Sequence, residues 1–184
     1  GSSEFNEVFF DNVEVADDAI VGELDRGWQG AMAVLTAERA TNRMYRGWRF
    51  ENEFNHFVRV CRNEPGLRHV LEDGLGRQEL AATAADIRIV QRYAQEIATR
   101  VVAGAPLEQL GSQMKLHWSE AHQRFAGFAQ RVLGPGAVDE SAERRQARRR
   151  FEKIYLRARS ESLIAGSTEV QLSIIADRVL KLPK

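Results

Sequence analysis

The chain has 184 residues, of which 43% are hydrophobic and 28% are charged, the composition of an ordinary globular domain with a buried core. Its 26 lysines and arginines balance 26 aspartates and glutamates, so we expect neither a nucleic-acid partner nor a membrane surface. The single cysteine, Cys61, excludes an internal disulfide and a multi-cysteine metal site, and it favours a cytoplasmic location. No apolar run reaches the roughly 18 residues that a membrane span needs.

The first part of the chain has the pattern of β structure. Residues 1–3 are typical of a remnant of an expression vector and do not enter the argument. Residues 4–22 are rich in β-branched and aromatic side chains, with turn-prone pairs at Asp11-Asn12 and Asp17-Asp18. The pattern predicts a strand or two with a turn. Because an isolated hairpin is only marginally stable, we expect that this segment either packs on the rest of the chain or has lost its sheet.

From residue 23 onward the apolar residues recur at helical spacing. We predict one long helix that begins near Trp28 and stops at residues 63–66. A second helix is predicted from about Arg77 to Val102, and a third ends at the GPG of residues 134–136.

Two further helices complete the predicted fold. The fourth runs from about Ser141 to Ser162 and is rich in arginine, and the fifth begins after Gly166. The residues of the fifth helix that we expect to face inward are Val170, Ile174, Ile175 and Val179. About five helices with short connections predict an all-α, up-down bundle preceded by a short β remnant.

Two stretches near the ends of the sequence resemble the acyl-CoA dehydrogenase family. They read FFDNVEVADDAIVGE with GWQGAMAVLTAERA near the start, and IAGSTEVQLSIIADRVLKLP at the end. The resemblance implies that residues 4–22 are the edge of that family's middle β domain and that residues 23–184 are its C-terminal helical bundle. It also implies that the chain is a fragment of a longer enzyme.

The closing stretch carries the implied cofactor site. Gly166, Thr168, Glu169 and Gln171 stand at the spacing of the family's GGTSEIQ signature, and by resemblance they bind FAD. The N-terminus of a helix that follows a glycine has unpaired amide donors, which suit a phosphate-bearing cofactor. The same residues also suit a plain glycine C-cap followed by a serine or threonine N-cap, and the sequence leaves both interpretations open.

The implied chemistry needs a carboxylate base, because the family removes an α-proton from an acyl-CoA thioester while a hydride passes to the flavin. Many members carry this base directly before the glycine of the closing signature, where the present sequence has Ala165. A minority branch carries it in the first long helix as L-x-x-E-R, which matches Leu35, Glu38 and Arg39. By resemblance, Glu38 is the candidate base, and Arg39 and Ala165 border the substrate.

Each of these residues also has a purely structural interpretation. In this interpretation Glu38 is an exposed helix glutamate that pairs with Arg43. Arg39 is then an ordinary surface arginine. Glu161 lies about one helical turn before Ala165, roughly 6 Å along a helix, which is too far for a base in that position. Glu169 suits a first-turn carboxylate favoured by the helix dipole.

Three segments depart from the family pattern. The R-x-x-F-G motif after the first helix is absent. The Q-x-x-G-G-x-G motif is reduced to RVLGPG. In it Arg131 takes the place of the glutamine, Gly134 is kept and Pro135 replaces the second glycine. Proline removes a backbone donor and the close approach that glycine permits. The RDA ahead of the closing signature becomes LRA at residues 156–158. We therefore expect poor FAD binding by this chain alone, since the family's site also draws on the β domain and a neighbouring subunit.

The remaining charged residues allow weaker inferences. The run ERRQARRR at residues 143–150 is either a solvated helix face or a surface for acidic groups of a partner or for CoA phosphates. His117 and His122 stand at i and i+5, which is off one helix face, so we predict no metal site.

Together, the residues and the resemblance predict a fragment of an FAD-dependent acyl-CoA dehydrogenase that introduces an α,β double bond into an acyl-CoA. We expect the fragment itself to be inactive, and the full protein to form homo- or hetero-oligomers, dimers or tetramers, through the bundle and to pass electrons to a separate acceptor. Two alternatives stay open. One is a non-catalytic or half-site partner subunit of a heteromeric enzyme, and the other is a flavin-dependent oxidase on the same fold.

Overall fold

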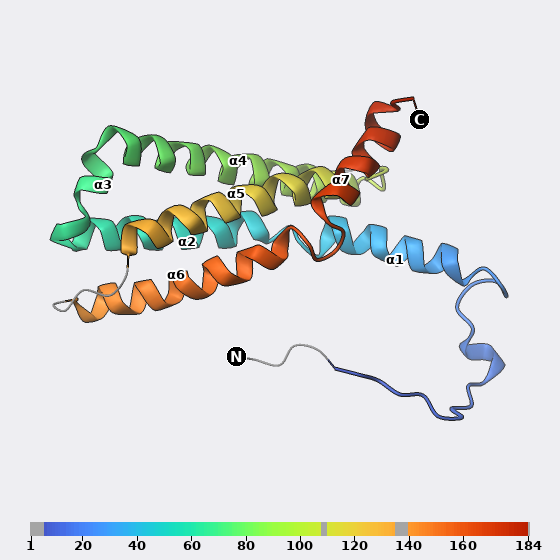
Figure 1. Cartoon of the computed structure of the whole chain (residues 1–184). Helices are drawn as coiled ribbons and strands as arrows, with labels where there is room; N and C mark the ends of the chain where they lie inside the picture. The colour runs from blue at the N-terminus through green and yellow to red at the C-terminus, as the bar shows by residue number, and fades with distance from the viewer. Residues whose placement is uncertain (1–5, 108–109, 135–139, 184) are drawn as a thin grey trace. The chain divides into compact units, whose positions relative to one another are not determined.

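The structure, a computed structural model, describes residues 6–107, 110–134 and 140–183, without the side chains of residues 36, 37, 39 and 40. The chain divides into two compact units, Gly1–Leu35 and Thr36–Lys184. Helices make up most of the second unit (Figure 1).

The first unit forms no strand among its described residues. A single 3-10 turn at Asp17–Ala19 precedes α1 (Gly27–Thr41), and residues 6–16 have no regular structure. The strands predicted from the sequence are therefore not formed. A strand is stable only when neighbours pair with its backbone, and the apolar side chains of this segment are largely exposed, Phe9 to 84%.

The predicted long first helix is in fact two helices. α1 ends at Thr41, and α2 (Arg46–Asn63) begins after a four-residue turn. Thr41 and the asparagine that follows are weak helix formers. At the start of α2, Gly47 lies so close to α4 (Gly74–Val102) that a Cβ would stand 2.8 Å from Cγ of Gln91. This close packing against α4 sets the course of α2.

The second unit is the up-down bundle that the sequence predicts. α2, α4, α5 (Leu110–Leu133) and α6 (Ala142–Glu161) run alternately in opposite directions, and α5 packs on both α4 and α6 (Figure 1). The short helices η2 (Pro65–Leu67) and α3 (His69–Glu72) join α2 to α4. α7 (Thr168–Ile175) packs on α5 and continues into a π-helical turn, η3 (Ala176–Leu180).

The starts of two bundle helices follow from their caps. The side chain of Ser141 accepts a hydrogen bond from the Arg144 amide at 3.0 Å, which confirms the predicted start of the fourth helix. Asp73 caps α4 in the same way through the Gly76 amide, also at 3.0 Å. The predicted stop of the third helix lies partly outside the described residues, since only Gly134 of the GPG is described.

The fifth helix faces inward only in part as predicted, since Ile174 and Ile175 are half-buried. Val170 and Val179 were expected to face inward but are 47% and 39% exposed. The buried residue of α7 is Gln171, whose amide bonds to the turn that precedes the helix. α7 is therefore anchored by a polar side chain, and this chain leaves several of its apolar residues uncovered.

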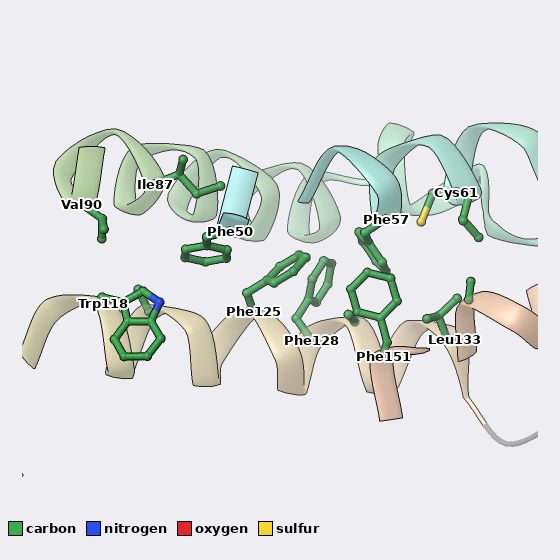
Figure 2. Close-up of a cluster of buried hydrophobic side chains, with 14 of the residues drawn as sticks. Phe50, Phe57, Cys61, Ile87, Val90, Trp118, Phe125, Phe128, Leu133 and Phe151 are labelled. Carbon is green, nitrogen blue, oxygen red and sulfur yellow. The ribbon is translucent and has the colours of Figure 1, made fainter. Parts of the chain in front are cut away.

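Aromatic side chains fill the centre of the bundle. The Phe125 ring of α5 lies 5.4 Å from Phe50, 5.7 Å from Phe57 and 6.0 Å from Phe151, measured between ring centroids (Figure 2). Phe50 and Phe57 belong to α2 and Phe151 to α6, so one ring joins three helices. Edge-to-face contacts of this kind add to the hydrophobic contribution of the buried area.

Phe125 provides the test of this core. Replacing it with alanine is expected to lower the free energy of unfolding by about 3–5 kcal/mol, because a cavity is left among the surrounding rings. Leu163→Ala is the control, since Leu163 is 69% exposed, and it should change stability by less than about 0.5 kcal/mol. Urea unfolding of this chain measures both variants. Equal effects of the two substitutions would contradict the assigned core.

Candidate functional site

The turn between α6 and α7, residues 162–167 and here named the closing turn, has an unusual backbone. Ala165 and Gly166 both lie in the left-handed region, with φ of 55° and 92°. Alanine rarely adopts this conformation, so neighbouring groups must hold it there. The Lys115 ammonium of α5 donates to the Gly166 carbonyl at 2.7 Å and to the Ser162 carbonyl at 3.4 Å. The Gln171 amide donates to the Ala165 carbonyl at 3.0 Å.

A chain of charged groups connects the candidate base to this turn. The Glu38 carboxylate, 42% exposed, lies 3.9 Å from the Arg43 guanidinium, which is itself largely buried. Burial lowers the pKa of the Lys115 ammonium, and the charge of nearby Arg43 lowers it further. Lys115 in turn contacts the closing turn. The structure thus brings Glu38 and the Ala165 position to the same end of the bundle.

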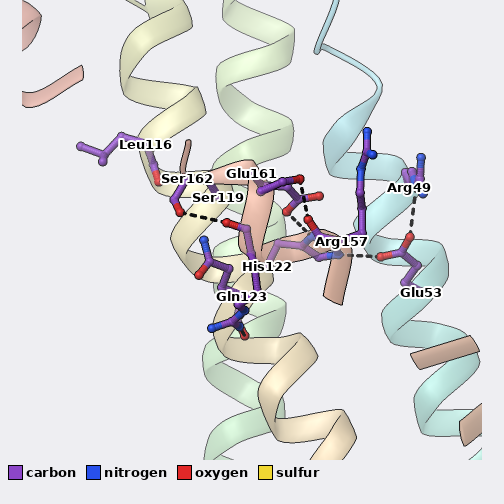
Figure 3. Close-up of polar contacts among 11 residues, drawn as sticks. Arg49, Glu53, Leu116, Ser119, His122, Gln123, Arg157, Glu161 and Ser162 are labelled. Atoms are coloured by element: carbon purple, nitrogen blue, oxygen red, sulfur yellow. Dashed lines mark hydrogen bonds and ion pairs between the residues drawn. The ribbon is translucent and has the colours of Figure 1, made fainter. Parts of the chain in front are cut away.

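A buried histidine lies on the same face of α5, two turns beyond Lys115. His122 donates from Nδ1 to Glu161 of α6 at 2.6 Å and from Nε2 to Glu53 of α2 at 2.7 Å (Figure 3). Both glutamate side chains are only 4% exposed. Arg49 donates to the second oxygen of Glu53 at 3.1 Å. One imidazole therefore joins three helices through charge-assisted hydrogen bonds.

This network holds a buried positive charge. Burial acts to lower the pKa of His122, but the hydrogen bonds to Glu161 and Glu53 outweigh it and raise the pKa to about 9. Burial acts to raise the pKa of Glu53, and the bonds from His122 and Arg49 outweigh that effect and lower it. His122 is thus an imidazolium at neutral pH, with both ring nitrogens donating.

The sequence of this folded chain was compared with known families and proteins. The model of the acyl-CoA dehydrogenase C-terminal domain matches residues 25–180. The chain belongs to the acyl-CoA dehydrogenase family. It is 33% identical over 187 residues to the acyl-CoA dehydrogenase IpdE1 of Mycobacterium tuberculosis and 31% identical to IpdE1 of Mycolicibacterium smegmatis.

These acyl-CoA dehydrogenases are longer than the chain described here. The alignments cover all of this chain but 46% and 44% of the two relatives, so the chain spans about half of their length. Among solved structures, the Tcur3481-Tcur3483 steroid ACAD superposes with a TM-score of 0.77 at 20% identity, over 96% of this chain and 45% of that one. At that identity the likeness shows the shared fold.

The two groups of predicted cofactor residues lie at opposite ends of the bundle. Arg131 and Gly134 are at the far end of α5, 16 and 19 positions beyond Lys115, roughly 24–28 Å along a helix. Arg131 is exposed, with a loose ion pair to Glu79 at 4.0 Å. The side chain of Arg39 and the whole of Pro135 lie outside the described residues. A single copy of this chain does not bring these residues together with the closing turn.

The start of α7 was the predicted contact for FAD, but most of its polar groups are already bonded within the chain. The Thr168 amide donates to the Ser162 carbonyl at 3.1 Å, and the Val170 amide to the Ser167 hydroxyl at 3.4 Å. Bonds from the Ser167 hydroxyl and from its own backbone amide lower the pKa of the Glu169 carboxylate. A Cβ on Gly166 would meet the Gln171 amide nitrogen at 2.4 Å, so this glycine serves internal packing.

A few groups near the closing turn could still contact a cofactor. They are the half-buried Thr168 side chain, the exposed Glu169 carboxylate, which also accepts hydrogen bonds within the chain, and the Gln171 Oε1, a buried acceptor without a partner. These residues fit one wall of a flavin site, but they form no complete diphosphate cradle by themselves.

The arginine run of α6 divides into two sets. Arg145 and Arg148 bond to Glu140, and Arg144 donates to the Leu133 carbonyl, so this set fixes the start of the helix. Arg149 and Arg150 instead line an 870 Å³ groove between α2 and α6. Neither of the two sequence interpretations, a solvated face or a binding surface, describes the whole run.

The network of Glu53, His122 and Glu161 was not predicted from the sequence. His122 was considered only as a metal ligand, and Glu161 only as a catalytic base. A signal was present, because each residue interrupts the apolar stripe of its helix: Glu53 between Phe50 and Phe57, and His122 between Trp118 and Phe125. Charged residues on three core-facing stripes indicate a shared buried network.

Among the described residues, no group of three metal-ligating side chains could hold a metal ion. No helix in the described part of the chain is long and apolar enough to cross a membrane.

The incomplete cradle predicts weak flavin binding. We expect this 184-residue chain to bind FAD at least about ten-fold more weakly than the full-length protein, because part of the diphosphate site must come from elsewhere. Quenching of flavin fluorescence on titration with each protein measures the difference. A stoichiometric, tightly bound flavin on this chain alone would contradict the expectation.

The His122 network predicts a pH-dependent stability. Because its pKa is raised from 6.5 to about 9 on folding, its contribution is fully present below pH 6.5 and is lost as the pH rises through 9. A shift of this size corresponds to about 3 kcal/mol. Urea unfolding of the wild-type chain between pH 6 and 9.5 should show that loss, and His122→Gln should remove most of the slope.

The control for this experiment is His69→Gln, since His69 is exposed and forms no such network. It should keep the wild-type pH dependence. A wild-type free energy of unfolding that is equal at pH 6 and pH 9.5 would show that His122 is not charged in the folded state.

Proposed function

We propose that this chain is the helical part of an FAD-dependent acyl-CoA dehydrogenase that forms an α,β double bond in an acyl-CoA thioester, with Glu38 as the base. The observation that supports it is the path from Glu38 through Arg43 and Lys115 to the closing turn, in which Ala165 stands where many members carry the base. Two helices can offer a carboxylate to one carbon atom, and in this proposal Glu38 of the first helix supplies it.

In the proposed reaction the Glu38 carboxylate accepts the α-proton of the thioester. FAD, when bound, supplies the acceptor for the hydride that leaves the β-carbon. Thr168 and Glu169 are the residues of this chain that would contact the cofactor. Arg43 orients Glu38 through the ion pair at 3.9 Å, and its other nitrogen, Nη1, is buried without a partner.

We further propose that the acyl group is bulky. Ala165 leaves free the space that a glutamate side chain would fill beside the reacting carbon. The similarity of the fold to a steroid ACAD supports this proposal. The cytoplasmic location stays a prediction from the single cysteine, and the oligomeric state and the separate electron acceptor stay predictions of the resemblance.

A half-site subunit is the second candidate. It is favoured by the separation of the two cofactor segments to opposite ends of the bundle and by the bonded amides at the start of α7. In this case two unlike chains would complete one flavin site, and Glu38 would have no part in turnover. For the oxidase alternative, oxygen consumption during turnover is the deciding observation.

The test compares Glu38→Gln with Glu152→Gln in the full-length protein. Glutamine keeps the shape of Glu38 but cannot accept the proton, so turnover and exchange of the substrate α-proton into deuterated water should fall by about 10²–10⁴-fold. Glu152 is an exposed carboxylate on α6, and its variant should behave as wild type. Undiminished turnover by Glu38→Gln would reject the base and favour the half-site subunit.

A further inference from the structure

Lys115 is the most deeply buried lysine that the structure describes. Its side chain is 1% exposed, and no carboxylate among the described residues forms an ion pair with it. Its nitrogen instead donates to two carbonyls, those of Ser162 and Gly166. A buried ammonium that bonds only to backbone carbonyls is costly to desolvate, so a hydrophobic residue would be the stable choice for packing alone.

The two acceptors lie on either side of the left-handed residue Ala165. Ser162 is the first residue of the turn, and its carbonyl also accepts the Thr168 amide of α7 at 3.1 Å. Lys115 therefore contacts both ends of the closing turn. The Gln171 amide supports the Ala165 carbonyl between them. The turn keeps its conformation through two side chains from outside it, one on α5 and one on α7.

Lys115 is part of a row on one face of α5. Trp118 follows it by three residues and His122 by seven. The Arg46 guanidinium of α2 lies 4.5 Å from the Trp118 ring, and His122 binds Glu161, the residue directly before Ser162. The contacts of Trp118 and His122 thus fix the rotation of α5 about its axis. This rotation places the Lys115 ammonium under the closing turn.

We propose that Lys115 is a positioning residue: by binding the Ser162 and Gly166 carbonyls it fixes the closing turn opposite Glu38 and so sets where the reacting carbon of the substrate lies. The inference rests on the proposed function. It assigns Lys115 no contact with substrate or cofactor, because the ammonium donates to two backbone carbonyls in the protein interior. Loss of the ammonium would let the turn relax, while the bundle core would stay intact.

The first experiment measures amide hydrogen exchange in this chain for wild type, Lys115→Met and Lys115→Gln. The Thr168 amide reports on the turn and the Ile97 amide on the core. Lys115→Met should speed exchange at Thr168 by about ten-fold or more and leave Ile97 unchanged, because only the local opening is affected. Lys115→Gln keeps a shorter, neutral donor and should be intermediate. Lys153→Met, at an exposed lysine of α6, is the matched control.

The second experiment measures kcat and KM of the same variants in the full-length protein. A displaced turn should lower kcat by about 10–100-fold with a smaller change in KM. Unchanged exchange at Thr168 would overturn the proposal, and so would a faster exchange with an unchanged kcat. If Lys115→Met fails to fold, which the Ile97 amide reports, Lys115→Gln decides. Failure of the proposed function is seen separately, as full activity of Glu38→Gln with the Thr168 exchange of wild type.

Discussion

The imidazolium of His122, bonded to Glu161 on one side and to Glu53 on the other, is the interaction on which the arrangement of the site depends. It is a charged group in a phenylalanine core, so its two partners must keep their positions or leave a buried charge unpaired. Glu161 is the last residue of α6 and Glu53 lies in α2. The network therefore fixes the end of α6 from which the closing turn departs, and it fixes α5 at the rotation that brings Lys115 beneath that turn.

Apolar packing and polar bonding have different roles along the bundle. Phe57, Phe125 and Phe151 are fully buried in its middle, where other hydrophobic residues of similar total volume would keep the helices together. Near the closing turn the contacts are polar and directional, through Lys115, Arg43 and Gln171. The main effect of such contacts is to hold the turn in a single defined geometry, and their effect on stability is smaller. A catalytic base and its substrate require a defined geometry.

The bundle, the helix caps and the family could be predicted from the sequence, because each depends on local patterns of spacing and residue type. The apolar stripe of α5 and the start of the fourth helix near Ser141 are examples. The division of the first helix at residues 42–45 could not, since it depends on the close approach of Gly47 to α4. The strands predicted before residue 22 failed for a similar reason: a strand needs a partner that local sequence does not reveal.

The candidate site was predictable only in part. Glu38 and Ala165 were found by resemblance, but the groups that connect them were not. Arg43 was named only as an ion-pair partner of Glu38, and Lys115 gives no local signal and becomes visible only when the helices are placed together. Gln171 shows the opposite case. Its position in the closing signature predicted a cofactor contact, whereas in this chain its amide is used to hold the closing turn. Its free carbonyl oxygen is what it could still offer to a cofactor.

The most direct measurement of the central claim is the distance from Glu38 to the reacting carbon in the full-length protein. A crystal structure with FAD and an acyl-CoA analogue that cannot be oxidised would provide it. The account predicts a Glu38 oxygen within about 3–3.5 Å of the α-carbon, with the closing turn on the other side of that carbon. A Glu38 side chain directed into solvent, or another carboxylate in its place, would contradict it.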